Sequence, residues 1–527
     1  MRGPLLNFTN SICAAALLPA ALALNACGGN SGGRADGGAG SGDGGGLVGP
    51  VTDQDWDGTP TASDCDDQND RIYPGISVAC TASCGAGTKT CGADGTYSTC
   101  SCAPLCEKAG TGTCYYVSAA TGSDTNPGTY NAPFKSYLNF NFYFNPPTTH
   151  VALQPGDVVY FLAGTYQDVY ACCGGPALDR AAFLRGVHGT PTAPITWKAY
   201  PGQKVIFGHH DSHPISVFDS SNLVIEGFEL VDGYGNGIDT DTVDGLEIRN
   251  NNIHDMRGSA PDNGATGIAL LSTSSVNIHH NSVHDNYDRA YPGPDHRQQM
   301  IFFQGGNIRV HHNHVYESDP LQGNGGVIYK HKSSIAGATY ELDHNLIEGC
   351  NQFGTASGTP NAHIHHNLFL NSGEPWVTDL GGPTQFSNYV FERNTIVGAG
   401  AINYDVQVGP NYGTLGPFIY RENIVVASGS NTNGFFVEVG HYQSDATYSA
   451  VVTGNQLSFG PNCYFNSSSP LSFSLFGAGE PAGTVLDLSG WKGAGYDANS
   501  VVDDPMLDAK YAPGLIACKG FGHLAEP

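Results

Sequence analysis

An acidic loop near the start of the chain has the residue types and the spacing of a calcium ligand set. Asp53, Asp55 and Asp57 alternate along it, Gly58 follows directly, and Asp64 lies further on. The carboxylates occupy positions 1, 3, 5 and 12 of a calcium-binding loop, and the glycine falls at position 6, where such a loop turns sharply. We therefore predict that Asp53, Asp55, Asp57 and Asp64 bind Ca²⁺, with a solvated acidic linker as the alternative.

The residues around this loop indicate a structural role for the ion. Gly and Pro flank the loop, so no helix–loop–helix unit surrounds it. The string DQDWDGTPTASDCDDQNDRIYPG resembles the Asp-rich metal-binding motifs of thrombospondin type 3 repeats and of related modules in bacterial surface proteins, and the resemblance implies a rigid stalk. Eight of the 15 cysteines lie between Cys65 and Cys114, which in an exported chain predicts disulfides of open connectivity.

The first residues of the chain predict export. Arg2 is followed by an apolar run that is too short to span a bilayer with polar flanks, which is typical of a signal peptide. The run ends in LNAC at 24–27, which resembles the lipobox of bacterial lipoproteins. This resemblance implies a lipid on Cys27 that anchors the protein to the outer membrane or the cell surface, with plain secretion as the alternative. Residues 28–50 are rich in Gly and Ser and predict a flexible linker.

The overall composition favours strands and turns and argues against some partners. Charged residues make up only 13% of the chain, whereas there are 71 glycines. The formal net charge of −26 argues against nucleic acid or an anionic lipid surface as a partner unless cations intervene. A chain of 527 residues is too long for one ordinary compact core, so we expect several domains or one elongated repeat.

A ten-residue unit recurs through the second part of the chain, for example VNIHHNSVHD from Val276. Apolar residues alternate on both sides of a central asparagine, which predicts strands, and the steps between central residues run from 22 to 32 residues, which predicts a solenoid. Stacked asparagines at the bend of each coil would satisfy one another as a hydrogen-bonded ladder. The central residues are Phe228, Asn251, Asn281, Asn313, Asn345, Asn367, Asn394, Asn423 and Asn455.

Two columns of histidines accompany the repeat. We predict stacked rings on the outer surface of the strands and not a metal site. The first column consists of His279, His311 and His365, and the second of His280, His312, His344 and His366.

The repeat has a known counterpart. Together with the stretch from Tyr115 to Tyr166, it resembles right-handed parallel β-helix proteins of the pectate-lyase-like superfamily over roughly residues 113–520. The resemblance implies an all-β fold, a right-handed parallel β-helix preceded by a small disulfide-rich calcium-binding module, and we expect a monomer. The predicted parts are a signal peptide at 1–27, a linker at 28–50, the metal-binding module at 51–112 and the β-helix at 113–527.

Acidic residues gather in the long loops of the central coils. Such loops on one side of consecutive coils are typical of a binding face. Stacked carboxylates repel one another, and a bound Ca²⁺ would remove that cost, whereas the alternative is that each carboxylate caps a turn. The predicted ligands of this second Ca²⁺ site are Asp255, Asp262, Asp285, Asp288 and Asp295.

A pair of lysines follows these loops in the chain. Lys330 and Lys332 are two residues apart on a predicted strand and therefore share a face. The string GNGGVIYKHK resembles the lysine-base strand of one pectate lyase family, which implies that Lys330 takes the C5 proton of a uronate. Lys332, Arg289 and Arg297 are then candidates for binding substrate carboxylates. The structural alternative is that both lysines pair with aspartates.

These observations leave three functions open. The first is a Ca²⁺-dependent polysaccharide lyase that cleaves an acidic, uronate-containing glycan by β-elimination. The second is a non-catalytic, surface-anchored β-helix for glycan binding or adhesion. The third is a polygalacturonase-type glycoside hydrolase, which we rank lowest because GIDTDTVDG matches only the first part of that family's aspartate motifs.

Overall fold

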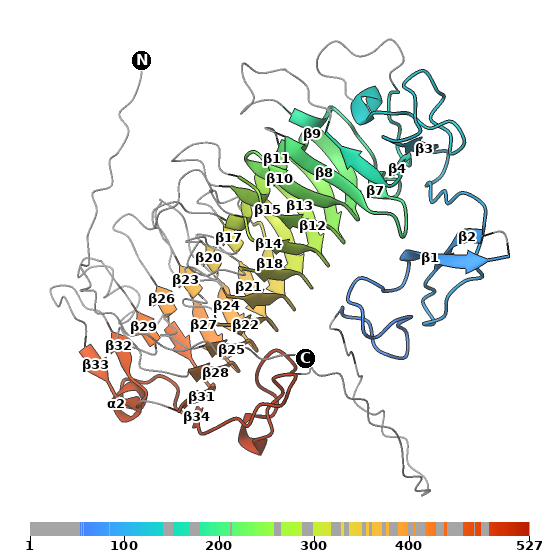
Figure 1. Ribbon diagram of the computed structural model, residues 1–527. Helices are drawn as coiled ribbons and strands as arrows, with labels where there is room; N and C mark the ends of the chain where they lie inside the picture. The colour runs from blue at the N-terminus through green and yellow to red at the C-terminus, as the bar shows by residue number, and fades with distance from the viewer. Residues whose placement is uncertain are drawn as a thin grey trace, which may run out of the picture. The chain divides into compact units, whose positions relative to one another are not determined.

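The β-helix is the main part of the protein and consists of parallel strands stacked coil upon coil. Figure 1 shows these strands following one another in chain order, from green to orange. The stacking confirms the predicted all-β, parallel β-helix fold. The computed structural model describes residues 53, 55, 57–83, 85–140, 151–167, 180–210, 213–257, 265–286, 299–317, 328–330, 337–349, 355–357, 361–371, 376–378, 388–398, 404–406, 417–427, 437–439, 457–467, 470–475 and 484–525.

Four long strands form the centre of the β-helix and bend in the middle. They are β9 (His213–Glu226), β11 (Asn236–Arg249), β13 (Thr266–His279) and β15 (Gln299–His311), and each pairs in parallel with the next. In β13 the bend lies between Ser272 and Ser275, which both have positive φ values, of 46° and 57°. The bend turns one continuous sheet around an edge, so that its two halves form two faces of the solenoid.

The halves of the long strands continue into two separate rows of short strands. The first face contains β6 (Arg180–Arg185), the first halves of the long strands, β17 (Ile328–Lys330), β20 (Thr355–Ser357), β23 (Trp376–Thr378), β26 (Tyr404–Val406), β29 (Val437–Val439) and β32 (Phe473–Leu475). The second face contains β3 (Cys114–Val117), β4 (Val158–Phe161), β7 (Ile195–Ala199), the second halves, β18 (Tyr340–Asp343), β21 (Ala362–His365), β24 (Tyr389–Glu392), β27 (Phe418–Arg421) and β30 (Leu457–Phe459).

A separate sheet of twelve strands closes the third side of the coils. Short elements complete the described structure: η1 (Tyr137–Phe140), β33 (Thr484–Leu486), α2 (Leu488–Gly493) and η4 (Ile516–Cys518). No described helix is long and apolar enough to cross a membrane. The twelve strands are β5 (Gly164–Tyr166), β8 (Val205–His210), β10 (Glu229–Gly233), β12 (Asn252–His254), β14 (Ser282–His284), β16 (His314–Tyr316), β19 (Leu346–Glu348), β22 (Leu368–Leu370), β25 (Thr395–Gly398), β28 (Ile424–Ala427), β31 (Cys463–Asn466) and β34 (Val501–Val502).

The core is built from aligned apolar residues of successive coils. Ile215, Ile238, Ile268 and Ile301 lie in register on the first face, and all four are fully buried. Burying a side chain of this size contributes about 1.5–3 kcal/mol. Each coil alone cannot bury its apolar residues, so stability depends on stacking, as the repeat predicts.

The asparagine ladder is present at the predicted bend. The backbone N–H and the Nδ2 of Asn281 both donate to Oδ1 of Asn313, each at 3.0 Å, and Asn281 itself is 2% exposed. The same pattern links the rungs from Asn251 onward, but the rung after Asn423 is Asn462 and not Asn455. The prediction for Asn455 was therefore wrong, and that residue lies outside the described part of the chain.

The N-terminal module contains the hairpin of β1 (Ser77–Ala82) and β2 (Gly85–Thr90), which pair antiparallel. Residues 51–527 form one compact unit. Within it, Nζ of the buried Lys198 lies 2.7 Å from Glu107 and 2.9 Å from Glu226, which links the module to the β-helix. The predicted disulfides are present and join Cys65 to Cys91, Cys80 to Cys100, and Cys106 to Cys114, while Cys463 and Cys518 are joined near the far end.

Candidate metal site and candidate substrate face

The acidic loop of the module gathers its carboxylates as the spacing predicts. Asp55, Asp57 and Asp64 each place an oxygen within 4.8 Å of the others, and Asp53 and Asp55 form a second such group with Asp67. The sequence interpretation missed Asp67 because it compared the loop with a template that stops at position 12. Its signal was present in the string DCDDQND.

The local fold leaves one oxygen of several carboxylates available for a cation. Oδ1 of Asp55, Asp57 and Asp64 accepts the backbone N–H two residues further on, at 3.3, 2.6 and 2.9 Å. The Oδ2 atoms of the same three side chains are buried and have no hydrogen-bond partner within the described structure. A buried, unsatisfied carboxylate oxygen is costly. Ca²⁺ prefers such oxygen ligands, so the residues present fit this ion.

The acidity of these groups reflects the same geometry. The pKa of Asp55 and of Asp57 is raised to about 7, chiefly by burial and in addition by the charges of neighbouring carboxylates. Burial also raises the pKa of Asp64. A divalent cation would reverse this effect, because it favours the charged form of every carboxylate around it.

The acidic loop lies directly on the second histidine column. Nε2 of His280 lies 3.0 Å from the carbonyl oxygen of Asp57. Gly58 has a φ of 86°, and a Cβ on it would come within 2.7 Å of His312 Nε2, so only glycine fits here. The ring of Tyr73 packs on His280 with a centroid distance of 4.3 Å. The module and the β-helix therefore meet at the loop that carries the candidate ligands.

The predicted stacking of the histidine rings is confirmed, but not every ring lies at the surface: the side chain of His344 is 40% exposed, whereas His280 is covered. His280 and His312 stack at 5.3 Å with an interplanar angle of 5°. His280 is only 5% exposed because the module covers it. Burial lowers the pKa of His280 to about 3 and lowers that of His312 well below its usual range. His366, at the other end of the column, lies against the carbonyl oxygen of Ala525.

Two of the carboxylates predicted for the second Ca²⁺ site lie at turns. Asp255 and Asp285 follow β12 and β14 directly and have positive φ values of 55° and 49°. Each accepts a hydrogen bond at 2.8 Å from Nδ1 of the preceding histidine, His254 or His284. Among the described side chains, neither joins a group of three possible metal ligands. The other residues predicted for the substrate face, Asp262, Asp288, Asp295, Arg289, Arg297 and Lys332, and the predicted lipidation site Cys27, lie outside the described residues.

Lys330 is the last residue of β17, on the first face. Its backbone lies in register with Phe303 of β15. Phe303 in turn aligns with Leu270 and Thr240, which are fully buried. The residues one position earlier on each strand form a second row in register, which runs from Asp239 through Phe302 to Tyr329. The assignment of Lys330 as a base stays a prediction.

The first face carries a polar cluster that the sequence interpretation did not identify. Asp239 is 5% exposed and accepts a hydrogen bond from Nδ2 of Asn236 at 3.0 Å. Nδ1 of His213 accepts the backbone N–H of Asn236 at 3.1 Å and lies 3.9 Å from Asp239 Oδ2. Its sequence signal was the string GIDTDTVDG, which contains Asp239 but was compared only with hydrolase motifs.

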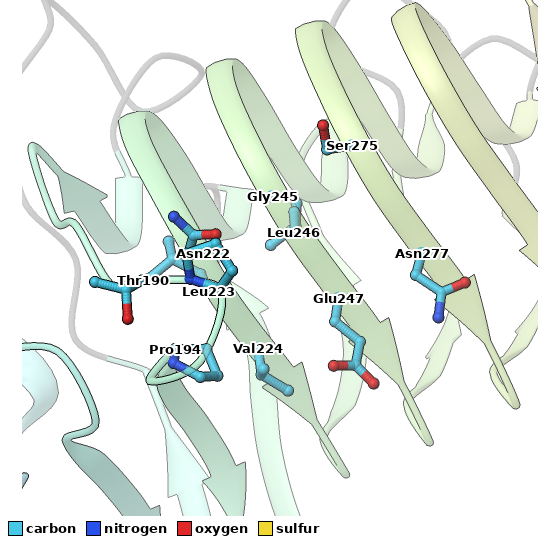
Figure 2. A pocket seen from close by; sticks show the side chains of 11 residues that line it. Thr190, Pro194, Asn222, Leu223, Val224, Gly245, Leu246, Glu247, Ser275 and Asn277 are labelled. Carbon is cyan, nitrogen blue, oxygen red and sulfur yellow. The ribbon is translucent and has the colours of Figure 1, made fainter. Parts of the chain in front are cut away.

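Figure 2 shows a pocket on the second face, over β9, β11 and β13. Its volume of about 180 Å³ is below the range of about 300–1,000 Å³ that is usual for small-molecule sites. Glu247, which lines it, accepts from Nη1 of Arg249 at 2.7 Å and lies 3.0 Å from Nε2 of His279. The pocket is therefore smaller than a usual small-molecule site, and Arg249 already engages its carboxylate.

Comparisons with known proteins agree with the fold. Residues 203–369 match the family model described as "Right handed beta helix region", which supports the predicted hand. No curated protein matches the chain. Similar solved structures include pectate lyase Pel9A (17% identity, 64% of this chain and 80% of that chain, TM-score 0.44) and a mannuronic acid-specific family 6 polysaccharide lyase from human gut microbiota (17%, 70% and 76%, TM-score 0.44). A rhamnogalacturonan lyase is also similar (16%, 71% and 79%, TM-score 0.34). With TM-scores below 0.5, these likenesses define no activity for this chain.

Proposed function

We propose that this protein is an exported polysaccharide lyase that cleaves an acidic, uronate-containing glycan by β-elimination and depends on Ca²⁺. The order of strands on the first face carries the proposal. β13, β15 and β17 are consecutive rungs, and rungs lie about 4.8 Å apart. The loops that lead into β13 and β15 contain Asp262, Asp288 and Asp295, and Lys330 ends β17. This order supports a shared site of carboxylates and a lysine.

The chemistry assigns one proton transfer to Lys330. Its neutral Nζ takes the proton from C5 of a uronate, the electron pair of that bond forms the C4–C5 double bond, and the glycosidic oxygen leaves C4 and gains a proton. Bound Ca²⁺ would neutralise the uronate carboxylate and so make the C5 proton more acidic. Lys332, Arg289 and Arg297 hold further carboxylates of the glycan. A cation near Lys330 would also lower its pKa toward the value that a base requires.

A panel of uronate polymers tests this proposal. We expect ultraviolet absorbance from an unsaturated product with Ca²⁺ and none with a chelator. Lys330→Ala should lower the rate by about 10²- to 10⁴-fold, as expected for loss of a general base. Lys204→Ala is the matched control, because its side chain is 67% exposed and pairs with Glu229 on another sheet. Equal activity of both variants would remove Lys330 from the mechanism.

The register of Lys330 favours a second candidate function, which is glycan binding without catalysis. Its backbone aligns with the buried residues Leu270 and Phe303 and not with the row of Phe302, which is only partly buried. A surface-anchored binding protein would retain its affinity in Lys330→Ala. Glycan binding without any product, from every polymer tested, would support this function over the lyase.

We also propose that the acidic loop binds Ca²⁺ as a structural ion and that a lipid on Cys27 anchors the exported protein. The three buried Oδ2 atoms without partners support the first of these. The contact between Asp57 and His280 supports a role in fixing the module to the β-helix.

A further inference from the structure

The outward side of the second face carries a cluster of two histidines and two glutamates that the proposed function does not use. His363 and His365 lie two residues apart on β21, so they share a face. Glu341 on β18 pairs with His363, and Glu392 on β24 pairs with His365. Glu341, His363 and His365 each offer a ligand atom within 4.8 Å of the others.

The hydrogen bonds around His365 determine where its proton lies. Nε2 of His366 lies 3.0 Å from the carbonyl oxygen of Ala525, which can only accept, so a neutral His366 carries its proton on Nε2. Its Nδ1 is therefore an acceptor, and Nδ1 of His365, 2.7 Å away, must donate to it. In the neutral ring of His365, Nε2 is then left with a lone pair.

That lone pair faces a carboxylate. Nε2 of His365 lies 3.2 Å from Oε1 of Glu341, and while the ring is neutral neither atom has a proton to share. Two acceptors at this distance repel each other unless a second proton on His365 or a metal cation lies between them. The spacing is close to the edge of a zinc tetrahedron, about 3.3 Å for bonds of about 2.0–2.1 Å.

The neighbouring arginines do not supply this cation. Arg309 lies near the other oxygen of Glu341, with Nε 3.5 Å from Oε2, and Arg309 also binds Asp343. Arg421 likewise binds Oε2 of Glu392, while Oε1 of that residue lies 3.0 Å from Nε2 of His363. Each glutamate thus turns one oxygen toward an arginine and the other toward a histidine.

The sequence predicted no metal at the histidine columns, but we propose that Glu341, His363 and His365 bind Zn²⁺ or a similar divalent transition metal, with Glu392 orienting His363. Imidazole nitrogen and carboxylate oxygen suit such metals, whereas Ca²⁺ prefers oxygen ligands alone. The site is therefore chemically distinct from the acidic loop. It joins β18 to β21, and it does not depend on the proposed lyase activity.

A similar arrangement surrounds His279, which lies next to His280 and faces Glu247, but it has no counterpart of His363. His280 donates from Nε2 to the carbonyl oxygen of Asp57, its Nδ1 lies 2.7 Å from Nδ1 of His279, and Nε2 of His279 faces Glu247 at 3.0 Å. Here Asn277 stands two residues before the histidine, where β21 has His363, and Arg249 binds the same glutamate oxygen at 2.7 Å. The guanidinium of Arg249 already supplies the positive charge beside Glu247, so we expect no metal there.

Zinc titration tests the proposal. The untagged full chain, with its thiols alkylated and its acidic loop saturated with Ca²⁺, is titrated with Zn²⁺ at pH 8 in an isothermal calorimeter. We expect one equivalent to bind. His363→Gln and Glu341→Gln should each weaken binding at least tenfold, and Glu392→Gln about 10- to 100-fold, as for other groups that orient ligands. Glu247→Gln, the matched control, should leave the affinity unchanged.

Circular dichroism and melting temperature show whether each variant folds, and we expect His363→Gln to fold because the side chain of His363 is 43% exposed. Failure of the wild-type chain to bind Zn²⁺ would overturn the proposal. Equal affinity in wild type, His363→Gln and Glu341→Gln would also overturn it, because the metal would then lie elsewhere.

Discussion

Removing Ca²⁺ should detach the acidic loop from the β-helix, because this loop lies on His280 and His312, while the disulfide of Cys106 and Cys114 still joins the module to β3. Extracellular calcium modules bind with Kd values of about 10⁻⁴–10⁻³ M. At about 10 mM free ion, the docked state would gain about 1.4–2.7 kcal/mol, which changes the detached fraction about 10- to 100-fold. The isosteric change Asp57→Asn should have a similar effect, since the amide retains Oδ1 for the Thr59 N–H at 2.6 Å but loses the ligand charge.

Limited proteolysis measures the detached fraction when opening is fast compared with cleavage. We expect cleavage within residues 51–112 to become about 10- to 100-fold faster with chelator or in Asp57→Asn. Asp94→Asn is the matched control, because Asp94 belongs to the same module but bonds only to Thr96 among its described contacts. Unchanged cleavage with chelator and in Asp57→Asn would refute the calcium site and favour the solvated acidic linker.

The same site predicts an unusual dependence on pH when Ca²⁺ is absent. The pKa values of Asp55 and Asp57 are raised in the folded protein to about 7, chiefly by burial, from about 3.9 in an unfolded chain. Between about pH 4 and pH 7 the folded state holds protons that the unfolded state has lost. The contribution of these two aspartates to stability is therefore fully present below about pH 4 and is lost as the pH rises through 7. Saturating Ca²⁺ should remove this loss, as melting curves at pH 5 and pH 8 would show. A calcium-free protein with equal stability at both values would contradict the assignment.

Three further predictions follow from single positions. Asn313→Ala leaves the backbone N–H of Asn281 without its acceptor, while Nδ2 of Asn281 keeps the carbonyl oxygens of Ile248 and His279, and should cost about 1–3 kcal/mol of unfolding free energy in a denaturant titration; a loss below about 0.5 kcal/mol would contradict the ladder. Gly58→Ala places a Cβ 2.7 Å from His312 Nε2 and should speed proteolysis of the module as chelation does, whereas Gly75→Ala, where nothing lies within 4 Å, should have a smaller effect. Cys27→Ser should move the protein from the membrane fraction to the soluble fraction, and an unchanged distribution would exclude the lipid anchor.

The repeat was the strongest sequence signal, because a buried asparagine in an apolar strand is tolerated only where a neighbouring coil satisfies it. The pattern failed at its end, where Asn455 is followed by the alternating residues QLSF and Asn462 by the continuous apolar run CYF, so the alternation favoured the wrong asparagine. The structure resolves the choice through the bonds from Asn423 to Asn462.

The burial of the histidines could not be predicted from the repeat itself. His280 is covered by Asp57, and His366 by Ala525, and both covering residues lie more than a hundred positions away in the chain. The convergence of the carboxylates in the acidic loop, by contrast, was predictable because these residues are close in sequence and their spacing brings their oxygens together. The side on which Lys330 lies depends on the register of β17 with β15, and the alternation of lysines within YKHK does not reveal that register.

The mass of the products formed from a uronate polymer tests the central claim most directly. β-Elimination yields oligosaccharides that lack one water molecule relative to the products of hydrolysis, and we predict these water-deficient products from at least one polymer in the presence of Ca²⁺. Fully hydrated oligosaccharides would instead identify a hydrolase, and the absence of any oligosaccharide from every polymer would contradict the lyase.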